Sequence, residues 1–346
     1  MPIRTLVVDD SVLFRNFLTS RLPEENQIEV IGSAVSGFDA CDKIPKLRPD
    51  VLTLDIEMPG MNGIELLKKL MVTHPIPTVL VSALNISVFD ALSAGAVDFA
   101  RKPDASAGES PDLFIAELRR KIKTAAAATP RASVNSAEIP PVRKEELVNS
   151  SKLDDIVIAM GASTGGTEAT LQVLGGLPAH TPGIVIVQHM PYGFTKMYAD
   201  RIDKSCAMDA KEAQNGDAVE QGRVLIARGD MHMRLVKIGS KYTVQCSPGE
   251  KVSGHCPSVD VLFESAAQAA GASAIGVILT GMGRDGANGL LKMKNSGAYT
   301  IGQDKSSCVV YGMPMAAMDT GAVTIQTPLD NISNIIKRQV NKMSLI

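Results

Sequence analysis

The first 123 residues alternate between short apolar runs and helix-forming stretches, and this alternation limits the possible fold more than any other feature of the chain. The apolar runs are residues 3–8, 28–34, 51–54, 78–81 and 97–100. The helical patterns are residues 11–21, 36–47, 63–73 and 112–123. Strands that alternate with helices in this way predict an α/β domain with a doubly wound, five-stranded parallel sheet.

Polar side chains follow the apolar runs at the points where the strands should end. They are Asp9, Asp10, Asp55, Ser82 and Lys102. In an open α/β sheet the carboxyl ends of the strands form the edge where ligands bind. Three carboxylates at one edge repel one another unless a cation joins them, and oxygen ligands suit Mg²⁺. The pattern predicts a site where an aspartate accepts a phosphoryl group beside a metal ion. A single aspartate at a strand end is often only turn chemistry, but five suitable residues at five such positions argue against that interpretation.

Residues 1–123 resemble a response-regulator receiver domain. The motifs that carry the resemblance are Val7-Val8-Asp9-Asp10-Ser11, Leu54-Asp55-Ile56-Glu57-Met58-Pro59-Gly60-Met61-Asn62-Gly63, Ser82-Ala83 and Lys102-Pro103. The resemblance implies phosphorylation at Asp55, and Mg²⁺ held by Asp10, Asp55 and the carbonyl of Glu57, with support from Asp9. It further implies that Ser82 is the switch hydroxyl, Phe99 the switch aromatic residue and Lys102 the partner of the phosphoryl group.

Residues 124–152 differ in character from the sequence on either side. Ala125 to Ala128 is low in complexity, prolines follow at 130, 140 and 141, and apolar periodicity disappears. This composition predicts a flexible linker between a receiver domain at 1–123 and a second domain at 153–346. A short helix or docking motif at 143–148 is the alternative, and a plain tether is favoured over it.

The second domain begins with an apolar run, residues 156–160, that breaks into Gly161-x-Ser163-x-Gly165 before a helical pattern starts at Thr167. A serine on such a strand-to-helix turn has an exposed hydroxyl. The backbone N–H groups that follow it, and the helix N-terminus, lie where negative charge would develop. The pattern therefore makes Ser163 a candidate nucleophile. A phosphate-binding turn or a merely tight turn remains the alternative for this stretch alone.

Two more apolar runs of the second domain end near residues able to assist such a serine. Residues 183–188 precede His189, and residues 274–279 precede the loop that contains Asp285. A serine hydroxyl needs a base, an imidazole is suitable, and a carboxylate orients that imidazole. His189 is the preferred base, with His232 and His255 as alternatives, and Cys256 is a weaker candidate nucleophile.

The remaining segments of the second domain indicate an α/β sheet with an insertion. Residues 210–212, 223–228 and 233–245 have the pattern of antiparallel strands, and Gly239-Ser240 suggests a hairpin turn. The prediction is a mainly parallel sheet with a β-hairpin insertion. The order Ser, His, acid along the chain differs from the order in the common hydrolase fold with a Gly-x-Ser-x-Gly motif, which argues against that fold.

A competing interpretation comes from Gly281-x-Gly283-x-x-Gly286, which matches a dinucleotide-binding fingerprint after a strand. Asp304 stands near the position of the acid that binds ribose in such sites. However, Asp285 within the loop would place a carboxylate beside a pyrophosphate, and this interpretation leaves Ser163 and His189 without a role.

Most of residues 153–343 resemble the chemotaxis protein-glutamate methylesterase domain (CheB type). The motifs are 161–166, 187–191, 227–233, 257–260 and 279–286, and Arg228 replaces a proline typical of the family. The resemblance implies Ser163 as nucleophile, His189 as base and Asp285 as orienting acid. It also implies that Thr164 and Met282 shape the oxyanion region.

Composition excludes several classes of protein. The net charge of −2 and the absence of Trp argue against a nucleic-acid binder. Five scattered cysteines fit reduced thiols better than a disulfide framework or a zinc site. No signal-peptide pattern and no apolar run of membrane-spanning length are present, so we expect a cytoplasmic protein without membrane insertion.

Together these features predict a hydrolase controlled by phosphorylation. The family resemblance implies that it would demethylate glutamyl methyl esters on chemotaxis receptors and deamidate receptor glutamines, with a histidine kinase as phosphodonor. Mg²⁺ is expected for phosphorylation, and no cofactor is expected for the esterase reaction. We expect the receiver to cap the catalytic cleft until Asp55 is phosphorylated. The alternative is a response regulator whose second domain binds a nucleotide or partner without catalysis.

Overall fold

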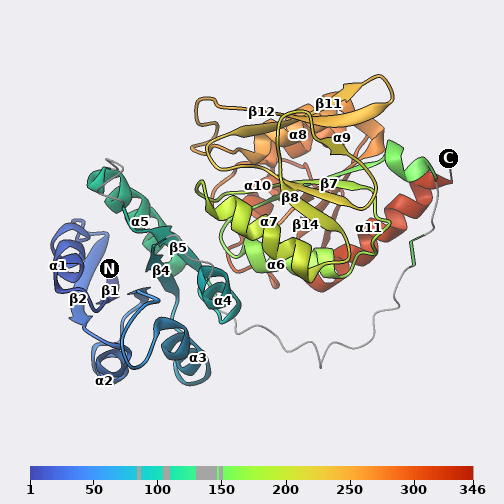
Figure 1. Ribbon diagram of the computed structural model, residues 1–346. Coiled ribbons are helices and arrows are strands. Elements are labelled where there is room, and N and C mark those ends of the chain that lie inside the picture. The colour runs from blue at the N-terminus through green and yellow to red at the C-terminus, as the bar shows by residue number, and fades with distance from the viewer. Residues whose placement is uncertain (84–86, 104–109, 130–145, 148–150, 346) are drawn as a thin grey trace. The chain divides into compact units, whose positions relative to one another are not determined.

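The computed structural model describes residues 1–83, 87–103, 110–129, 146–147 and 151–345 (Figure 1). The chain divides into two compact units, Met1–Ser136 and Ala137–Ile346. Most of the predicted linker and of the possible helix at 143–148 lies outside the described residues. Each unit is described by itself.

The first unit contains the predicted five-stranded parallel sheet, in the order β2-β1-β3-β4-β5. Its strands are β1 (Ile3–Val8), β2 (Ile28–Ala34), β3 (Val51–Leu54), β4 (Thr78–Ser82) and β5 (Asp98–Arg101). The order reverses at β1, so the carboxyl ends of β1 and β3 lie side by side at the point where such sheets bind ligands.

Helices cover both faces of this sheet. They are α1 (Val12–Arg21), α2 (Gly37–Leu47), α3 (Gly63–Thr73), α4 (Ser87–Ser93) and α5 (Pro111–Ala126). Ser11, Ser36 and Asn62 accept hydrogen bonds from first-turn N–H groups of α1, α2 and α3, which explains where these helices begin. The sequence did not predict α4, which is short, and α5 continues three residues past the expected end at 123.

The second unit contains a seven-stranded sheet in the order β15-β14-β13-β6-β7-β10-β8, and every recorded pairing in it is parallel. Its strands are β6 (Val157–Ala162), β7 (Gly183–Gln188), β8 (Asp209–Glu212), β10 (Arg223–Ile226), β13 (Ala274–Ile278), β14 (Tyr299–Gln303) and β15 (Ile325–Thr327). The prediction that 210–212 and 223–228 are antiparallel was wrong. Helix α7 (Phe194–Ser205), which the sequence did not predict, carries the chain back across the sheet between β7 and β8 and makes the parallel direction possible.

The predicted hairpin is present in a separate antiparallel sheet of order β11-β12-β9. Its strands are β9 (Ala218–Val219), β11 (His232–Ile238) and β12 (Lys241–Ser247). The remaining helices are α6 (Gly166–Gly175), α8 (Val259–Ala269), α9 (Ala287–Asn295), α10 (Met313–Asp319) and α11 (Leu329–Ser344), with short 3₁₀ turns at Ser151–Asp155 and Gly271–Ser273. Helices α6, α7 and α11 pack together, and α8 packs against both α9 and β11 (Figure 1).

Buried apolar side chains join the large sheet to α8, α9 and the hairpin sheet in one core. Phe263 on α8 and Tyr242 on β12 are both almost fully buried in it. This packing fixes α8 over the strands that carry the candidate site. Among the described residues, no helix is long and apolar enough to cross a membrane.

Candidate functional site

Three neighbouring strands, β13, β6 and β7, bring the predicted site residues of the second unit to one edge of the sheet. The β6–β7 register pairs Ala162 with Gln188, so Ser163 and His189 are the next residues of adjacent strands. His189 N–H donates to Ala162 O at 3.1 Å, and Ser163 N–H donates to Thr280 O at 3.0 Å. The sheet therefore positions both residues through the backbone.

Ser163 lies in the strand-to-helix turn that the glycine motif predicted. Gly165 has φ of +76°, a left-handed conformation that favours glycine, and α6 begins at the next residue. A Cβ on Gly281 would lie 2.7 Å from the Cβ of Ser163, so the neighbouring loop approaches the serine too closely for a larger residue. The turn and this loop leave Ser163 largely buried, with 9% of its surface exposed.

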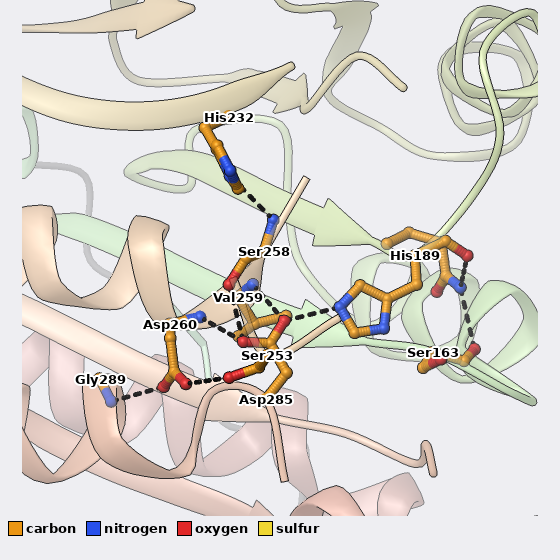
Figure 2. Close-up of polar contacts among 10 residues, drawn as sticks. Ser163, His189, His232, Ser253, Ser258, Val259, Asp260, Asp285 and Gly289 are labelled. Carbon is orange, nitrogen blue, oxygen red and sulfur yellow. Dashed lines mark hydrogen bonds and ion pairs between the residues drawn. The ribbon is translucent and has the colours of Figure 1, made fainter. Parts of the chain in front are cut away.

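Asp285 binds the imidazole of His189 and the start of helix α8 (Figure 2). Its Oδ2 lies 2.7 Å from His189 Nε2. The carboxylate also accepts hydrogen bonds from Ser258 Oγ at 2.7 Å, from Val259 N–H at 2.7 Å and from Asp260 N–H at 3.0 Å. A carboxylate at a helix N-terminus is stabilised by the helix dipole and by unpaired N–H groups.

These contacts keep Asp285 ionised although it is buried. Burial alone would raise the pKa of Asp285, but the hydrogen bond and the charge of His189, together with donors from Asp260 and Ser258, lower it below the ordinary value. The group is therefore a fixed negative charge next to the imidazole. It can hold the ring in one tautomer, with the proton on Nε2, and stabilise an imidazolium.

The other ring nitrogen of His189 is on the side of Ser163, since Figure 2 shows the imidazole between Asp285 and Ser163. Nδ1 is buried and has no hydrogen-bond partner among the described residues. No hydrogen bond joins it to Ser163 Oγ, so that link of the expected relay is not formed in this structure. Such contacts are commonly long without substrate and tighten when it binds. Gln188 Nε2 donates to the carbonyl oxygens of Ser163, at 2.9 Å, and His189, at 3.3 Å, and ties the two residues together.

The two alternative histidines have different surroundings. His232 is buried on β11, with Nε2 2.8 Å from Glu250 O and Nδ1 3.3 Å from Ser258 N, so both of its nitrogens are occupied. His255 lies against the ring of His189. Cys256 adjoins this stack, and burial raises the pKa of its thiol, which makes it a poorer nucleophile at neutral pH.

The two residues expected near the oxyanion belong to the two loops that meet at Ser163. Thr164 is buried in the turn after Ser163, and its carbonyl accepts a hydrogen bond from Thr280 Oγ1. Met282 follows Gly281 in the loop that touches Ser163, and its side chain is exposed. Within the described residues, the backbone N–H of Met282 has no recorded acceptor.

The dinucleotide fingerprint has the predicted strand-to-helix context, but its acidic residues are engaged elsewhere. Asp285 binds His189 and the start of α8. Asp304 accepts hydrogen bonds from Ser306 and from both the N–H and the hydroxyl of Ser307. A carboxylate that closes its own turn is not free to bind a ribose, which weakens the nucleotide interpretation.

In the first unit, the predicted carboxylates meet at the carboxyl ends of β1 and β3. Ligand oxygens of Asp9, Asp10 and Asp55 all lie within 4.8 Å of one another. Lys102 Nζ lies 2.9 Å from Asp9 Oδ2 and 2.5 Å from Asp55 Oδ2. Asp9 is fixed further by the N–H of Ser11 at 2.9 Å.

The charges in this cluster are only partly compensated. Burial raises the pKa of Asp55, and the negative charge of Asp9 raises it further. The hydrogen bond to Lys102 and the attraction to its charge oppose this rise. Burial would lower the pKa of Lys102, but hydrogen bonds to Asp55 and Asp9 raise it. Three clustered carboxylates with one ammonium fit a hard divalent cation with oxygen ligands, as Mg²⁺ requires.

The remaining residues predicted for this site surround the cluster. Glu57 N–H donates to Asp55 Oδ1 at 3.3 Å, which places the Glu57 backbone beside the expected phosphorylation site. Ser82 ends β4, and its buried hydroxyl has no hydrogen-bond partner among the described residues. Phe99 on β5 is buried, with Lys121 Nζ 5.5 Å from its ring centroid.

The sequence predicted no role for Ser258 or Gln188, although both lie within motifs of the family. Ser258 precedes α8 as its N-cap residue, but its hydroxyl binds Asp285 and makes no side-chain cap for the helix. The available signal was a serine directly before an apolar helix. What the sequence could not provide was the position of that helix end beside Asp285, which depends on tertiary packing.

Comparison with known proteins agrees with both halves of the chain. The family model described as CheB methylesterase matches residues 158–336, and the response regulator receiver domain matches residues 5–107. A protein-glutamate methylesterase/protein-glutamine glutaminase of Syntrophomonas wolfei is 52% identical over 99% of this chain and 98% of its own length. One from Pseudomonas aeruginosa is 43% identical over 98% and 97%.

Among solved structures, the CheB methylesterase catalytic domain of Thermotoga maritima covers 53% of this chain and 97% of its own length. It is 37% identical, with a TM-score of 0.52. These similarities and the two matched domains identify the family. The chain belongs to the CheB methylesterase family and carries a response-regulator receiver domain ahead of its methylesterase domain.

Proposed function

We propose that this chain is a phosphorylation-controlled esterase that hydrolyses glutamyl methyl esters on chemotaxis receptors and also deamidates receptor glutamines. The names of its relatives support this substrate class. The observation that carries the proposal is the 2.7 Å contact between His189 and Asp285, next to Ser163 at the end of the adjacent strand.

In the proposed reaction Ser163 Oγ attacks the ester carbonyl and gives its proton to His189 Nδ1. Asp285 stabilises the resulting imidazolium through Nε2. The N–H groups of Thr164 and Met282 donate to the oxyanion. Methanol leaves with the proton from His189, and water attacks the acyl-enzyme with His189 again as base. With a glutamine substrate ammonia leaves instead, and the same oxyanion forms.

Ser163→Ala tests the assignment of the nucleophile. We expect methanol release from methylated receptor to fall to the background rate, with phosphorylation of Asp55 unchanged. The retained phosphorylation shows that the receiver is intact, and thermal unfolding followed by tyrosine fluorescence checks the catalytic unit. Undiminished methanol release would exclude Ser163 as nucleophile.

The proposed control operates through Asp55. When bound, Mg²⁺ would neutralise charge on the incoming phosphoryl group. Asp10, Asp55 and the Glu57 carbonyl would hold the ion, with support from Asp9. Lys102 would pair with the phosphoryl oxygens, while Ser82 and Phe99 would respond to the new charge. We propose a chemotaxis histidine kinase as phosphodonor and a faster esterase reaction as the result.

Asp55→Asn tests this control. Acetyl phosphate with Mg²⁺ should raise the esterase rate of the natural chain and leave that of the variant unchanged. Equal rates with and without phosphodonor in the natural chain would contradict the control.

We place the protein in the cytoplasm, and the five free cysteines support a reducing compartment.

A further inference from the structure

A second imidazole lies flat against the candidate base. The ring centroids of His189 and His255 are 3.6 Å apart, and their planes differ by 6°. So short a centroid distance leaves little offset between the rings. Offset or edge-to-face pairs are electrostatically preferred over this arrangement, so the main effect of His255 is to confine the neighbouring ring.

The chain holds His255 in this position with a tight turn. Val252 and His255 exchange two backbone hydrogen bonds of 3.0 Å. The two residues between them have left-handed φ values, +53° at Ser253 and +83° at Gly254. Such a pair of values is typical of the two-residue hairpin turn that glycine favours at its second position.

Both ends of this segment are fixed to the network around Asp285 (Figure 2). Ser253 Oγ lies 3.2 Å from Asp260 Oδ2, and Asp260 Oδ1 accepts the N–H of Gly289 at 2.7 Å. Ser258, three residues after His255, donates to Asp285. The residue that stacks on His189 and the carboxylate that binds it are therefore held by one continuous piece of chain.

We propose that His255 is a positioning residue for His189, an inference that rests on the proposed function. The contact with Asp285 restrains only the Nε2 edge of the ring and leaves the ring able to rotate about the Cβ–Cγ bond. A flat group against one face blocks that rotation. It keeps Nδ1 directed at Ser163 and excludes water from that face of the imidazole.

Three variants of the whole chain test this role: His255→Ala, His255→Leu and His255→Phe. Phenylalanine keeps a flat ring, leucine keeps apolar volume without one, and alanine removes both. Val252→Ala is the control, because Val252 pairs with His255 through its backbone and its side chain is exposed. For each protein, with acetyl phosphate and Mg²⁺ present, we would measure kcat and KM on methylated receptor and the rate at which a fluorophosphonate labels Ser163.

We expect the alanine and leucine variants to lose about three- to tenfold in kcat and in labelling rate, with KM unchanged within error. The phenylalanine variant and the control should match the natural chain. Alanine and leucine variants as active as the natural chain, or a phenylalanine variant as slow as they are, would overturn the proposal. Thermal unfolding shows whether the alanine variant is merely misfolded, and the leucine variant then replaces it.

The labelling rate separates this inference from the proposed function. If the natural chain labels at Ser163 but releases no methanol, the substrate assignment fails and the variants still report on positioning. If Ser163 is not labelled and methanol is released, the assignment of the nucleophile fails, and the inference falls with it.

Discussion

The hydroxyl of Ser258 donates a 2.7 Å hydrogen bond to Asp285 Oδ1. The carboxylate that binds His189 through Oδ2 is thereby fixed at its other oxygen by the residue that precedes α8. Orientation of the base thus depends on the start of α8, to which the sequence assigned no catalytic role.

Ser258→Ala removes this donor while the N–H groups of Val259 and Asp260 continue to bind the carboxylate. We expect kcat to fall about threefold to tenfold, since a hydrogen bond to a charged group contributes about 1.5–3 kcal/mol and two donors remain. Steady-state methanol release measures the effect.

Ser265→Ala is the matched control, because Ser265 lies on the same helix and its buried hydroxyl bonds Leu235 and Leu262. It should lower stability without lowering kcat. If both variants reduced kcat equally, Ser258 would act only through the general stability of α8.

Asp285→Asn should lower kcat by about 10² to 10⁴, because an amide cannot stabilise the imidazolium and favours the wrong tautomer. Because the pKa of Asp285 is lowered in the folded protein, this variant should also change the free energy of unfolding. Since the carboxylate is favoured in the folded state, its contribution is present above about pH 4 and is lost as pH falls through the folded value.

Urea unfolding followed by tyrosine fluorescence measures that contribution in the second unit, which contains all five tyrosines. The natural chain should be more stable than Asp285→Asn at neutral pH, and the difference should shrink as the pH falls below about 4. A difference that did not change with pH would contradict the proposed ionisation.

The positions of the site residues at the sheet edge could be predicted because they depend on strand ends. Ser163 and His189 directly follow buried strands, and a parallel sheet brings such positions to the same edge. Asp285 is different, since it lies seven residues beyond the end of β13. Its contact with His189 depends on where α8 begins, and that follows from packing among distant segments.

The direction of β8 and β10 could not be read from the sequence for a related reason. Side-chain alternation reports which face of a strand is buried, and it is the same in parallel and antiparallel pairs. Helix α7, between β7 and β8, sets the direction of β8, and residues 213–222, which include β9, carry the chain back so that β10 runs parallel to β8. The stack of His255 on His189 was equally hidden, because it depends on a local turn whose residues have no catalytic pattern.

Asp55→Asn should stabilise the receiver at neutral pH in the absence of divalent ions. The pKa of Asp55 is raised by burial and by Asp9, so the folded state disfavours its charge. The stabilising contribution of the protonated acid is complete below about pH 4 and is lost as pH rises through the folded value. The gain from Asn should therefore disappear toward low pH.

Calorimetry of the receiver transition measures this effect, with Mg²⁺ as the internal control. Mg²⁺ should raise the transition temperature of the natural chain more than that of Asp55→Asn, because a ligand stabilises the state that binds it. A chelator should reverse the rise and prevent phosphorylation by acetyl phosphate. Equal responses to Mg²⁺ would mean that Asp55 is not a ligand.

Ser82→Ala should uncouple phosphorylation from activity without destabilising the receiver. The Ser82 hydroxyl is buried and has no hydrogen-bond partner within the described residues. Its removal therefore breaks no hydrogen bond and eliminates a buried polar group whose hydrogen-bonding capacity is not satisfied. We expect the receiver transition temperature to stay the same or rise by a few degrees, as about 1 kcal/mol would produce. The stimulation by acetyl phosphate should fall, because the phosphoryl group has lost its switch hydroxyl, and Ser82→Thr should restore it. Full stimulation in the alanine variant, with Asp55 phosphorylated to the same extent, would remove Ser82 from the switch.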